Sequence, residues 1–397
     1  MKVPFLDISR QNIGIKSEVE KVLSEIYNSN SFIGGKYVKK FEEKISSALG
    51  VKYAVSCASG TDALVIALRA FGIGDGDEVI TTAFTFFATA EAIAQVGAKP
   101  VFVDINEEDY LINLNHIVDK ITDKTKAILP VHIFGAPCEM DKIMEMAYNY
   151  DIKVIEDSAQ AIGAKYKDRY TGTVGHAGCF SFYPTKNLGG CGDGGMVTTD
   201  DDNIAIILSA LHEHGAGKNG AKARELLGGD RIDIQLNEKA EGGYDPYKYY
   251  NYLIAYNSRL DAFQAAILSI KLDHLQDYNY KRSKIASLYN DGLSDKIIKP
   301  LYSNSAEPCW HQYVIRTEYK YELCEYLSEH DIGVGTFYPV PLHLQKAFSY
   351  LEYKEGMLPI TEKICNQTVC LPIYPGLTDD EVGYVIDCIN DFCNKEH

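Results

Sequence analysis

The chain has 397 residues and a formal net charge of −16 at pH 7. A surface with this charge repels a phosphate backbone, so nucleic acid is not an expected partner. The hydrophobic content of 46% is ordinary for a globular protein. No apolar run approaches the roughly 18 residues of a membrane span. The first residues, MKVPFLDISRQN, lack the apolar core of a signal peptide.

Ten cysteines are scattered through apolar segments. No C-x-x-C pair and no histidine cluster has the spacing of a zinc site, so we expect no metal centre. Unpaired thiols in apolar surroundings are typical of a reducing compartment. The composition therefore favours a cytoplasmic protein.

Residues 50–200 alternate between short apolar runs and helical patterns. Strands alternating with helices predict βαβ units and a mostly parallel sheet with buried strands. Seven strands, the last two joined through a glycine-rich loop, indicate a mixed sheet in an α/β fold. The predicted strands are 53–57, 78–82, 100–104, 127–132, 153–157, 178–183 and 195–199, and the predicted helices between them include 61–70, 87–95 and 139–150.

Single hydrophobic cores stop growing at about 250–300 residues, so 397 residues predict two domains. We expect a large domain over 1–260 and a smaller α+β domain over 261–397. Residues 215–250 are rich in glycine, charge and tyrosine, which predicts a long loop or insertion. Further predicted elements are helices near 258–274, 320–330 and 379–394 and a strand at 312–316.

Open α/β sheets bind ligands at the carboxyl ends of their strands. The first strand is followed by Gly60 and Thr61 at the start of a helix. Free N–H groups at this position suit a phosphate, although an ordinary helix cap would look the same. Phe86 follows the second strand, where it could stack on a planar ring or pack in the core.

The fifth predicted strand ends in Asp157, and Lys186 follows the sixth. A carboxylate at the end of an apolar strand should be paired or functional, since burying a bare charge is costly. A lysine amine forms an imine with an aldehyde when its surroundings lower its pKa. Pyridoxal phosphate (PLP) sites use such a lysine together with an acid at the pyridine nitrogen. Each residue is a weak signal alone, but together they favour a PLP enzyme.

These residues resemble the DegT/DnrJ/EryC1/StrS family of sugar aminotransferases, which have the fold-type I PLP architecture. The similarity covers nearly the whole chain. The matching stretches are PFLD (4–7), SGTDAL (59–64), FTF (84–86), EDSAQ (156–160), SFYPTK (181–186), GDGG (192–195), YNSRLD (256–261), WHQY (310–313) and YPVPLH (338–343). So many collinear matches are specific for the family but not for the sugar.

The resemblance implies a role for each matching residue. Lys186 is similar to the Schiff-base lysine that also shuttles the proton. The other implied contacts are Asp157 to the pyridine nitrogen, Gln160 to the ring hydroxyl, Phe86 stacked on the ring, Gly60, Thr61 and Ser181 to the phosphate, and Tyr338 and His343 to the sugar. Asn257 resembles a residue that reaches the phosphate from the neighbouring subunit, which implies a homodimer with shared sites.

Three positions depart from the family pattern. Ala255 replaces a frequent glycine, Asn251 stands where many members have a histidine, and the 215–250 segment is longer than in many relatives. The last two could alter how the sugar is recognised. The long segment could equally be a decoration of the dimer surface.

The function implied by the resemblance is transfer of an amino group, from glutamate, onto a keto group of a nucleotide-linked sugar. A PLP-dependent sugar dehydratase is one alternative, but its relatives replace the lysine with histidine, and this chain has Lys186. A regulatory homologue that has lost catalysis is another. An amino-acid aminotransferase would need an arginine for the substrate carboxylate, and Arg259 and Arg316 both stay open for that role.

Overall fold

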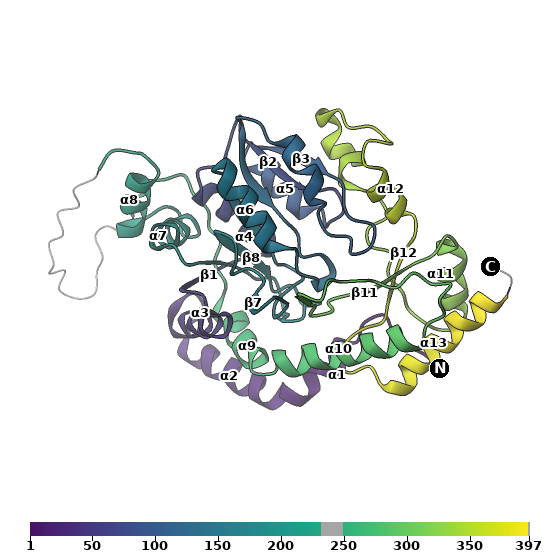
Figure 1. The fold of residues 1–397 in the computed structure, drawn as a ribbon. Helices are drawn as coiled ribbons and strands as arrows, with labels where there is room; N and C mark the ends of the chain where they lie inside the picture. Colours follow the sequence, from purple (N-terminus) through teal and green to yellow (C-terminus); the bar gives the residue numbers. More distant parts are fainter. Residues whose placement is uncertain (232–248, 396–397) are drawn as a thin grey trace.

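A computed structural model of the chain describes residues 1–231 and 249–395 (Figure 1). A seven-stranded sheet with the order β1-β9-β8-β5-β4-β2-β3 forms its centre. The pairs between β8, β5, β4, β2 and β3 are parallel, whereas β9 is antiparallel to β1 and β8. Six strands therefore end at the same edge. The strands are β1 (Tyr53–Cys57), β2 (Glu78–Thr82), β3 (Lys99–Val103), β4 (Thr125–Leu129), β5 (Lys153–Asp157), β8 (Ala177–Ser181) and β9 (Gly195–Thr199).

The mixed seven-stranded α/β sheet confirms the predicted fold class. Strands β1, β2, β5 and β9 have the predicted bounds. Strand β4 ends at Leu129, three residues before its predicted end, because Pro130 has no N–H for the sheet and the chain then turns. The turn passes through Phe134 and Gly135, which both have positive φ.

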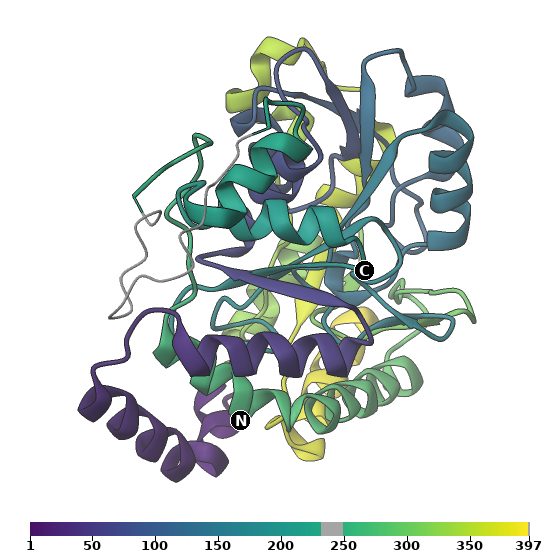
Figure 2. The same cartoon turned by 90° about the vertical axis from the view of Figure 1, so that its left-hand side faces the viewer.

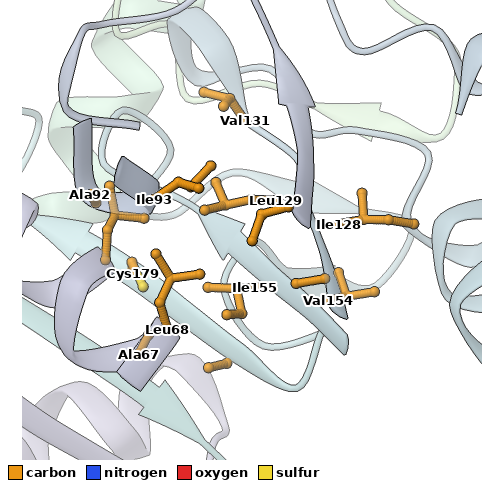
Figure 3. Packing of buried hydrophobic residues seen from close by; sticks show 14 of the residues in the cluster. Ala67, Leu68, Ala92, Ile93, Ile128, Leu129, Val131, Val154, Ile155 and Cys179 are labelled. Carbon is orange, nitrogen blue, oxygen red and sulfur yellow. The ribbon is translucent and has the colours of Figure 1, made fainter. Parts of the chain in front are cut away.

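Both faces of the sheet are covered. Side chains alternate along a strand, so Cys179 and Val197 face one hydrophobic cluster while Phe180 and Met196 face another. Figure 3 shows the first cluster, where α4 and α5 pack on β4, β5 and β8. On the other face lie α3 and α9, which pack against each other (Figure 2). The strands between them read as continuous apolar runs for this reason.

The helices surround this sheet and extend the molecule on both sides of it. Figure 1 shows α7 and α8 at one end and α11 and α13 at the other. None of the helices in the two described ranges is long and apolar enough to cross a membrane. The helices are α1 (Ile8–Asn12), α2 (Lys16–Ser29), α3 (Gly35–Leu49), α4 (Gly60–Ala70), α5 (Ala88–Gln95), α6 (Met140–Tyr150), α7 (Asp202–Leu211), α8 (Gly217–Leu226), α9 (Ala262–Leu272), α10 (Leu275–Gly292), α11 (Lys320–Glu329), α12 (Pro359–Cys365) and α13 (Asp379–Asn394).

The C-terminal part has its own hydrophobic cluster, in which α10, α11 and α13 pack around a two-stranded sheet of β11 (Tyr313–Arg316) and β12 (Thr368–Leu371). A small third sheet joins β6 (Lys165–Tyr166), β7 (Arg169–Tyr170) and β10 (Ala306–Glu307). Val3 belongs to the C-terminal cluster, whereas α9 packs with the large sheet. Both cross the predicted division between 1–260 and 261–397, which stays a prediction.

The segment 215–250 is not one continuous loop. It contains α8, in which Gly220 allows the backbone of Gly215 to approach so closely that a Cβ atom would clash. Asn251, at the family position that often holds histidine, donates from Nδ2 to the carbonyl of His214 at 2.9 Å. The loop prediction is therefore wrong for α8, and residues 232–248 lie outside the described part of the chain.

Candidate active site

A cavity of about 780 Å³ opens where the parallel strands end. The segments that follow β1, β2, β5 and β8 form most of its wall, and residues after β10 and before α12 close it. Eight predicted site residues line this one cavity, although up to 278 positions separate them in the sequence. They are Gly60, Thr61, Phe86, Asp157, Gln160, Ser181, Lys186 and Tyr338.

Lys186 follows β8 on a short turn, where its N–H donates to the carbonyl of Tyr183 at 2.9 Å. The side chain is half-buried and lines the cavity. Burial lowers the pKa of Lys186 to about 8, while the charge of Asp157 acts in the opposite direction. A substantial fraction of the amine is therefore neutral near physiological pH, as a nucleophile requires.

Asp157 is the last residue of β5 and is 5% exposed. Its Oδ2 accepts a hydrogen bond from Thr89 Oγ1 at 2.8 Å, and its Oδ1 accepts from the N–H of Ala159 at 3.1 Å. Burial nevertheless raises the pKa of Asp157. A positively charged partner in the cavity would stabilise the carboxylate in this position.

The amino terminus of α4 meets β8 at the cavity wall. Ser59 caps the helix by accepting from the N–H of Asp62 at 3.1 Å. A Cβ atom on Gly60 would lie only 2.6 Å from Cβ of Ser181. The glycine therefore leaves space for the N–H groups of Gly60 and Thr61 beside the serine hydroxyl. This combination suits an anionic group such as a phosphate.

Gln160 and Tyr338 form a hydrogen-bonded pair in the cavity. The N–H of Phe134 donates to Oε1 of Gln160 at 2.7 Å, which leaves its amide nitrogen as the donor. Nε2 donates to the hydroxyl of Tyr338 at 2.9 Å. Phe86 lies with its ring centre 6.3 Å from that of Tyr338 and is 58% exposed, so it is not a core residue.

Two residues had no role assigned from the sequence: His311, which extends this wall, and Asn187, which contacts it from behind. His311 lines the cavity and lies with Nδ1 3.1 Å from Oδ1 of Asn187. Asn187 uses its Nδ2 to donate to Cys309 and Asn279, both at 2.8 Å. Burial and the charge of Lys186 lower the pKa of His311 well below its usual value, so the imidazole is neutral. The matching WHQY stretch was the only sequence signal for it.

A buried pair behind the cavity supports the strand ends. Glu156 is fully buried and accepts from His132 Nε2 at 2.8 Å and from the N–H groups of Gly172, Val174 and Gly175. Burial opposes ionisation, but the hydrogen bonds from His132 and the backbone hold the pKa of Glu156 below its usual range. This network fixes the strand end that holds Asp157. The sequence suggested no partner for Glu156.

Two predicted site residues lie elsewhere. His343 does not line the cavity: its side chain is buried, and Nε2 lies 3.0 Å from Oε1 of Glu362. Asn257 is exposed and also lies outside the cavity of its own chain. The neighbouring Ser258 ties this segment to α4, since its hydroxyl donates to Oδ2 of Asp62 at 2.6 Å.

A lysine amine and a strand-end carboxylate in one cavity at the carboxyl edge of a mixed seven-stranded sheet are typical of fold-type I enzymes. The model of the DegT/DnrJ/EryC1/StrS aminotransferase family matches residues 14–390. The chain belongs to this family.

Two relatives match over almost their full length. A protein of Geobacillus stearothermophilus named pleiotropic regulatory protein is 42% identical over 99% of this chain and 99% of its own length. The dTDP-3-amino-3,6-dideoxy-alpha-D-galactopyranose transaminase of Aneurinibacillus thermoaerophilus is 38% identical over 98% of this chain and 99% of its own.

Solved structures show the same architecture. The structure of S. venezuelae DesV in complex with a ketimine intermediate has a TM-score of 0.90 at 34% identity and covers 100% of both chains. Bacillus subtilis NtdA with bound cofactor PMP has a TM-score of 0.85 at 30% identity, over 99% of this chain and 86% of that one. The fold is therefore that of the fold-type I aminotransferases.

Proposed function

We propose that the chain is a PLP-dependent aminotransferase that moves an amino group from glutamate onto a keto group of a nucleotide-linked sugar. The observation that supports this most directly is the amine of Lys186 in the same cavity as the carboxylate of Asp157. The transaminase of A. thermoaerophilus and the DesV complex support the reaction type.

The residues of the cavity fit PLP. The open first turn of α4 and Ser181 would hold the phosphate, with Gly60 giving the necessary space. Asp157 would face the ring nitrogen, and Gln160 the ring hydroxyl through its Nε2. The exposed ring of Phe86 offers a stacking surface. NtdA, with its bound PMP, supports the same cofactor for this chain.

Bound PLP supplies an aldehyde that condenses with amines and a ring that accepts electrons from the substrate. The amine of Lys186 would hold the cofactor at that aldehyde and, when free, would move a proton as base and acid. The negative charge of Asp157 would keep the ring nitrogen protonated. Neutral His311 adds no charge beside Lys186, so the pKa of the lysine is set by burial, which lowers it, and by Asp157, which raises it.

We further propose a homodimer in which Asn257 reaches the phosphate in the partner's cavity. Asn257 is exposed and lies outside its own cavity, but Ser258 fixes it beside the first turn of α4. In a two-fold dimer the contacts are reciprocal, so a residue that reaches the partner's site does so in both subunits. His343 would act indirectly, by holding the segment that carries Tyr338. The ten unpaired cysteines support the cytoplasm as its location.

The experiment that tests the substrate class uses enzyme already converted by glutamate to the amino form of the cofactor. Candidate 3-keto and 4-keto sugar nucleotides are added one at a time, and the return of the aldehyde form is followed by absorbance. If the absorbance band of the aldehyde form returns with a sugar nucleotide but not with the free sugar, the proposal is supported. Return only with 2-oxo acids identifies an amino-acid aminotransferase instead.

A regulatory role is a second candidate because the relative from G. stearothermophilus is named a regulatory protein. The two roles make different demands on the cavity. A purely regulatory protein needs no amine at position 186, so its regulatory effect would survive Lys186→Ala. Loss of the effect together with the amine would tie regulation to the chemistry.

A further inference from the structure

The cavity built by one chain has too little positive charge for its proposed ligands. Among its described lining residues, Lys186 is the one cation, and Asp157 and Asp193 are carboxylates. His311 is neutral because its pKa is lowered. The cofactor phosphate, a sugar nucleotide and glutamate are all anionic. Cations and N–H donors from a second chain would help to balance them.

The sequence left two arginines open for an anion. Arg316 is 4% exposed, lies 3.1 Å from Oε1 of Glu107 through Nη1 and does not line the cavity. Its guanidinium is already paired with a carboxylate of its own chain. Arg259 lies instead on the surface segment next to Asn257, outside the cavity of its own chain.

Arg259 holds the side-chain amide of Asn257 in one orientation. Its Nη2 donates to Oδ1 of Asn257 at 2.6 Å, and its Nη1 lies 3.2 Å from Oε1 of Glu213. Glu213 and Asn257 are also joined through a backbone bridge. An asparagine can present its oxygen or its NH2 group. With Oδ1 turned toward the guanidinium, the two N–H donors of Nδ2 point away from Arg259.

We infer that Arg259 is a positioning residue, which orients the amide of Asn257 so that its NH2 group donates to the cofactor phosphate in the partner subunit's cavity. Phosphate oxygens accept hydrogen bonds, so the reversed amide would set an oxygen against them. Glu213 keeps the guanidinium in place. This inference rests on the proposed function, in which Asn257 reaches that phosphate.

The test is a double-mutant cycle on cofactor binding to the apo dimer. Dissociation constants for PLP and for pyridoxal, which has no phosphate, are measured by absorbance for wild type, Asn257→Ala, Arg259→Leu and the double variant. We expect Arg259→Leu to weaken PLP binding about tenfold, the size of one charge-assisted hydrogen bond. In the Asn257→Ala background, Arg259→Leu should weaken PLP binding by less than about twofold. Pyridoxal binding should be unaffected.

Three results would overturn the inference in different ways. An undiminished effect of Arg259→Leu in the Asn257→Ala background would mean that the guanidinium contacts the phosphate itself. Equal losses for PLP and pyridoxal would mean a general structural role. If Asn257→Ala alone leaves PLP binding unchanged, the inter-subunit contact of the proposed function fails, and the role of Arg259 fails with it.

Two further variants guard against misfolding and charge effects. Arg259→Lys keeps the charge but lacks the second guanidinium nitrogen, so it should bind PLP nearly as weakly as Arg259→Leu. Lys142→Leu on α6 removes a cation from a comparable exposed pair, with Glu139 at 2.9 Å, and should leave PLP binding unchanged. Size-exclusion chromatography of each variant checks that the dimer persists.

Discussion

Gly60 at the start of α4 and Ser181 at the end of β8 lie so close that a Cβ atom on the glycine would come within 2.6 Å of the serine Cβ. Gly60→Ala should therefore push the first turn of α4 away from β8 and disturb the phosphate position. We expect PLP to bind at least about tenfold more weakly, which corresponds to a loss of about 1.4 kcal/mol of binding free energy. Absorbance titration of the apo protein measures this loss.

A matched glycine provides the control for that experiment. Gly383 lies within α13, and a Cβ atom there would meet nothing within 4 Å. Gly383→Ala should raise stability slightly, because alanine is the better helix former by about 1 kcal/mol, and should not change PLP binding. Unchanged PLP binding by Gly60→Ala would contradict the assigned phosphate position.

The lowered pKa of Lys186 predicts how cofactor capture depends on pH. Only the neutral amine attacks an aldehyde, and burial lowers the pKa of Lys186 to about 8. The rate at which apo protein captures PLP should therefore rise with pH and level off above about pH 8–9. Stopped-flow absorbance at a series of pH values measures the midpoint.

Asp157 should influence the midpoint pH of PLP capture. Its negative charge favours the protonated lysine and so raises the pKa of Lys186. Asp157→Asn should move the capture midpoint to lower pH. A midpoint that stays fixed or moves to higher pH would show that the two groups do not interact as the structure indicates.

Lys186 should also cost the apo protein stability. Its pKa is lower in the folded state than the ordinary 10.5, so the folded state binds fewer protons between about pH 8 and 10.5. The loss of folding stability has its full size below pH 8, becomes smaller as the pH rises and is gone above about pH 10.5. Lys186→Met should then raise the free energy of unfolding at pH 7 by about 1–3 kcal/mol.

Denaturant unfolding of apo wild type and Lys186→Met at pH 7 and at pH 10 checks this prediction. The difference between the two proteins should be larger at pH 7. A difference that does not change with pH would mean that the lysine is solvated, and one that grows toward pH 10 would mean that its pKa is raised in the folded state.

Tyr338 offers a test of the sugar side of the cavity. Its hydroxyl accepts from Gln160 Nε2, so its own hydrogen is free to donate to a ligand. Tyr338→Phe should lower kcat/KM for the sugar nucleotide by about tenfold, as loss of one buried hydrogen bond does, while PLP binding stays within about twofold. His343→Gln serves as comparison, and an equal loss of PLP binding in Tyr338→Phe would assign the tyrosine to the cofactor.

Strands of the large sheet could be predicted from sequence because each is a short apolar run between turn residues. Strand β12 (Thr368–Leu371) was missed, since four residues without alternation give no periodic signal. Helix α8 was missed because its glycines indicate a loop, although Gly220 leaves room for the backbone of Gly215 in the turn before the helix. Local sequence does not reveal such a contact.

The site could be predicted where chemistry follows a strand end, as for Asp157 and Lys186. It could not be predicted where a residue acts through a distant partner. Glu156 depends on His132 and the backbone of the turn before β8, and the amide of Gln160 is oriented by Phe134. His343 fills a buried position against Glu362, which motif matching cannot distinguish from a cavity wall.

Lys186 should bind PLP and begin the amino transfer. Absorbance spectra of the purified protein before and after adding glutamate, with Lys186→Ala as control, test this role. We predict a visible band of lysine-bound cofactor that glutamate converts to the near-ultraviolet band of the amino form, and no such band in the variant. A wild-type protein that gains no band when PLP is added would contradict this role of Lys186.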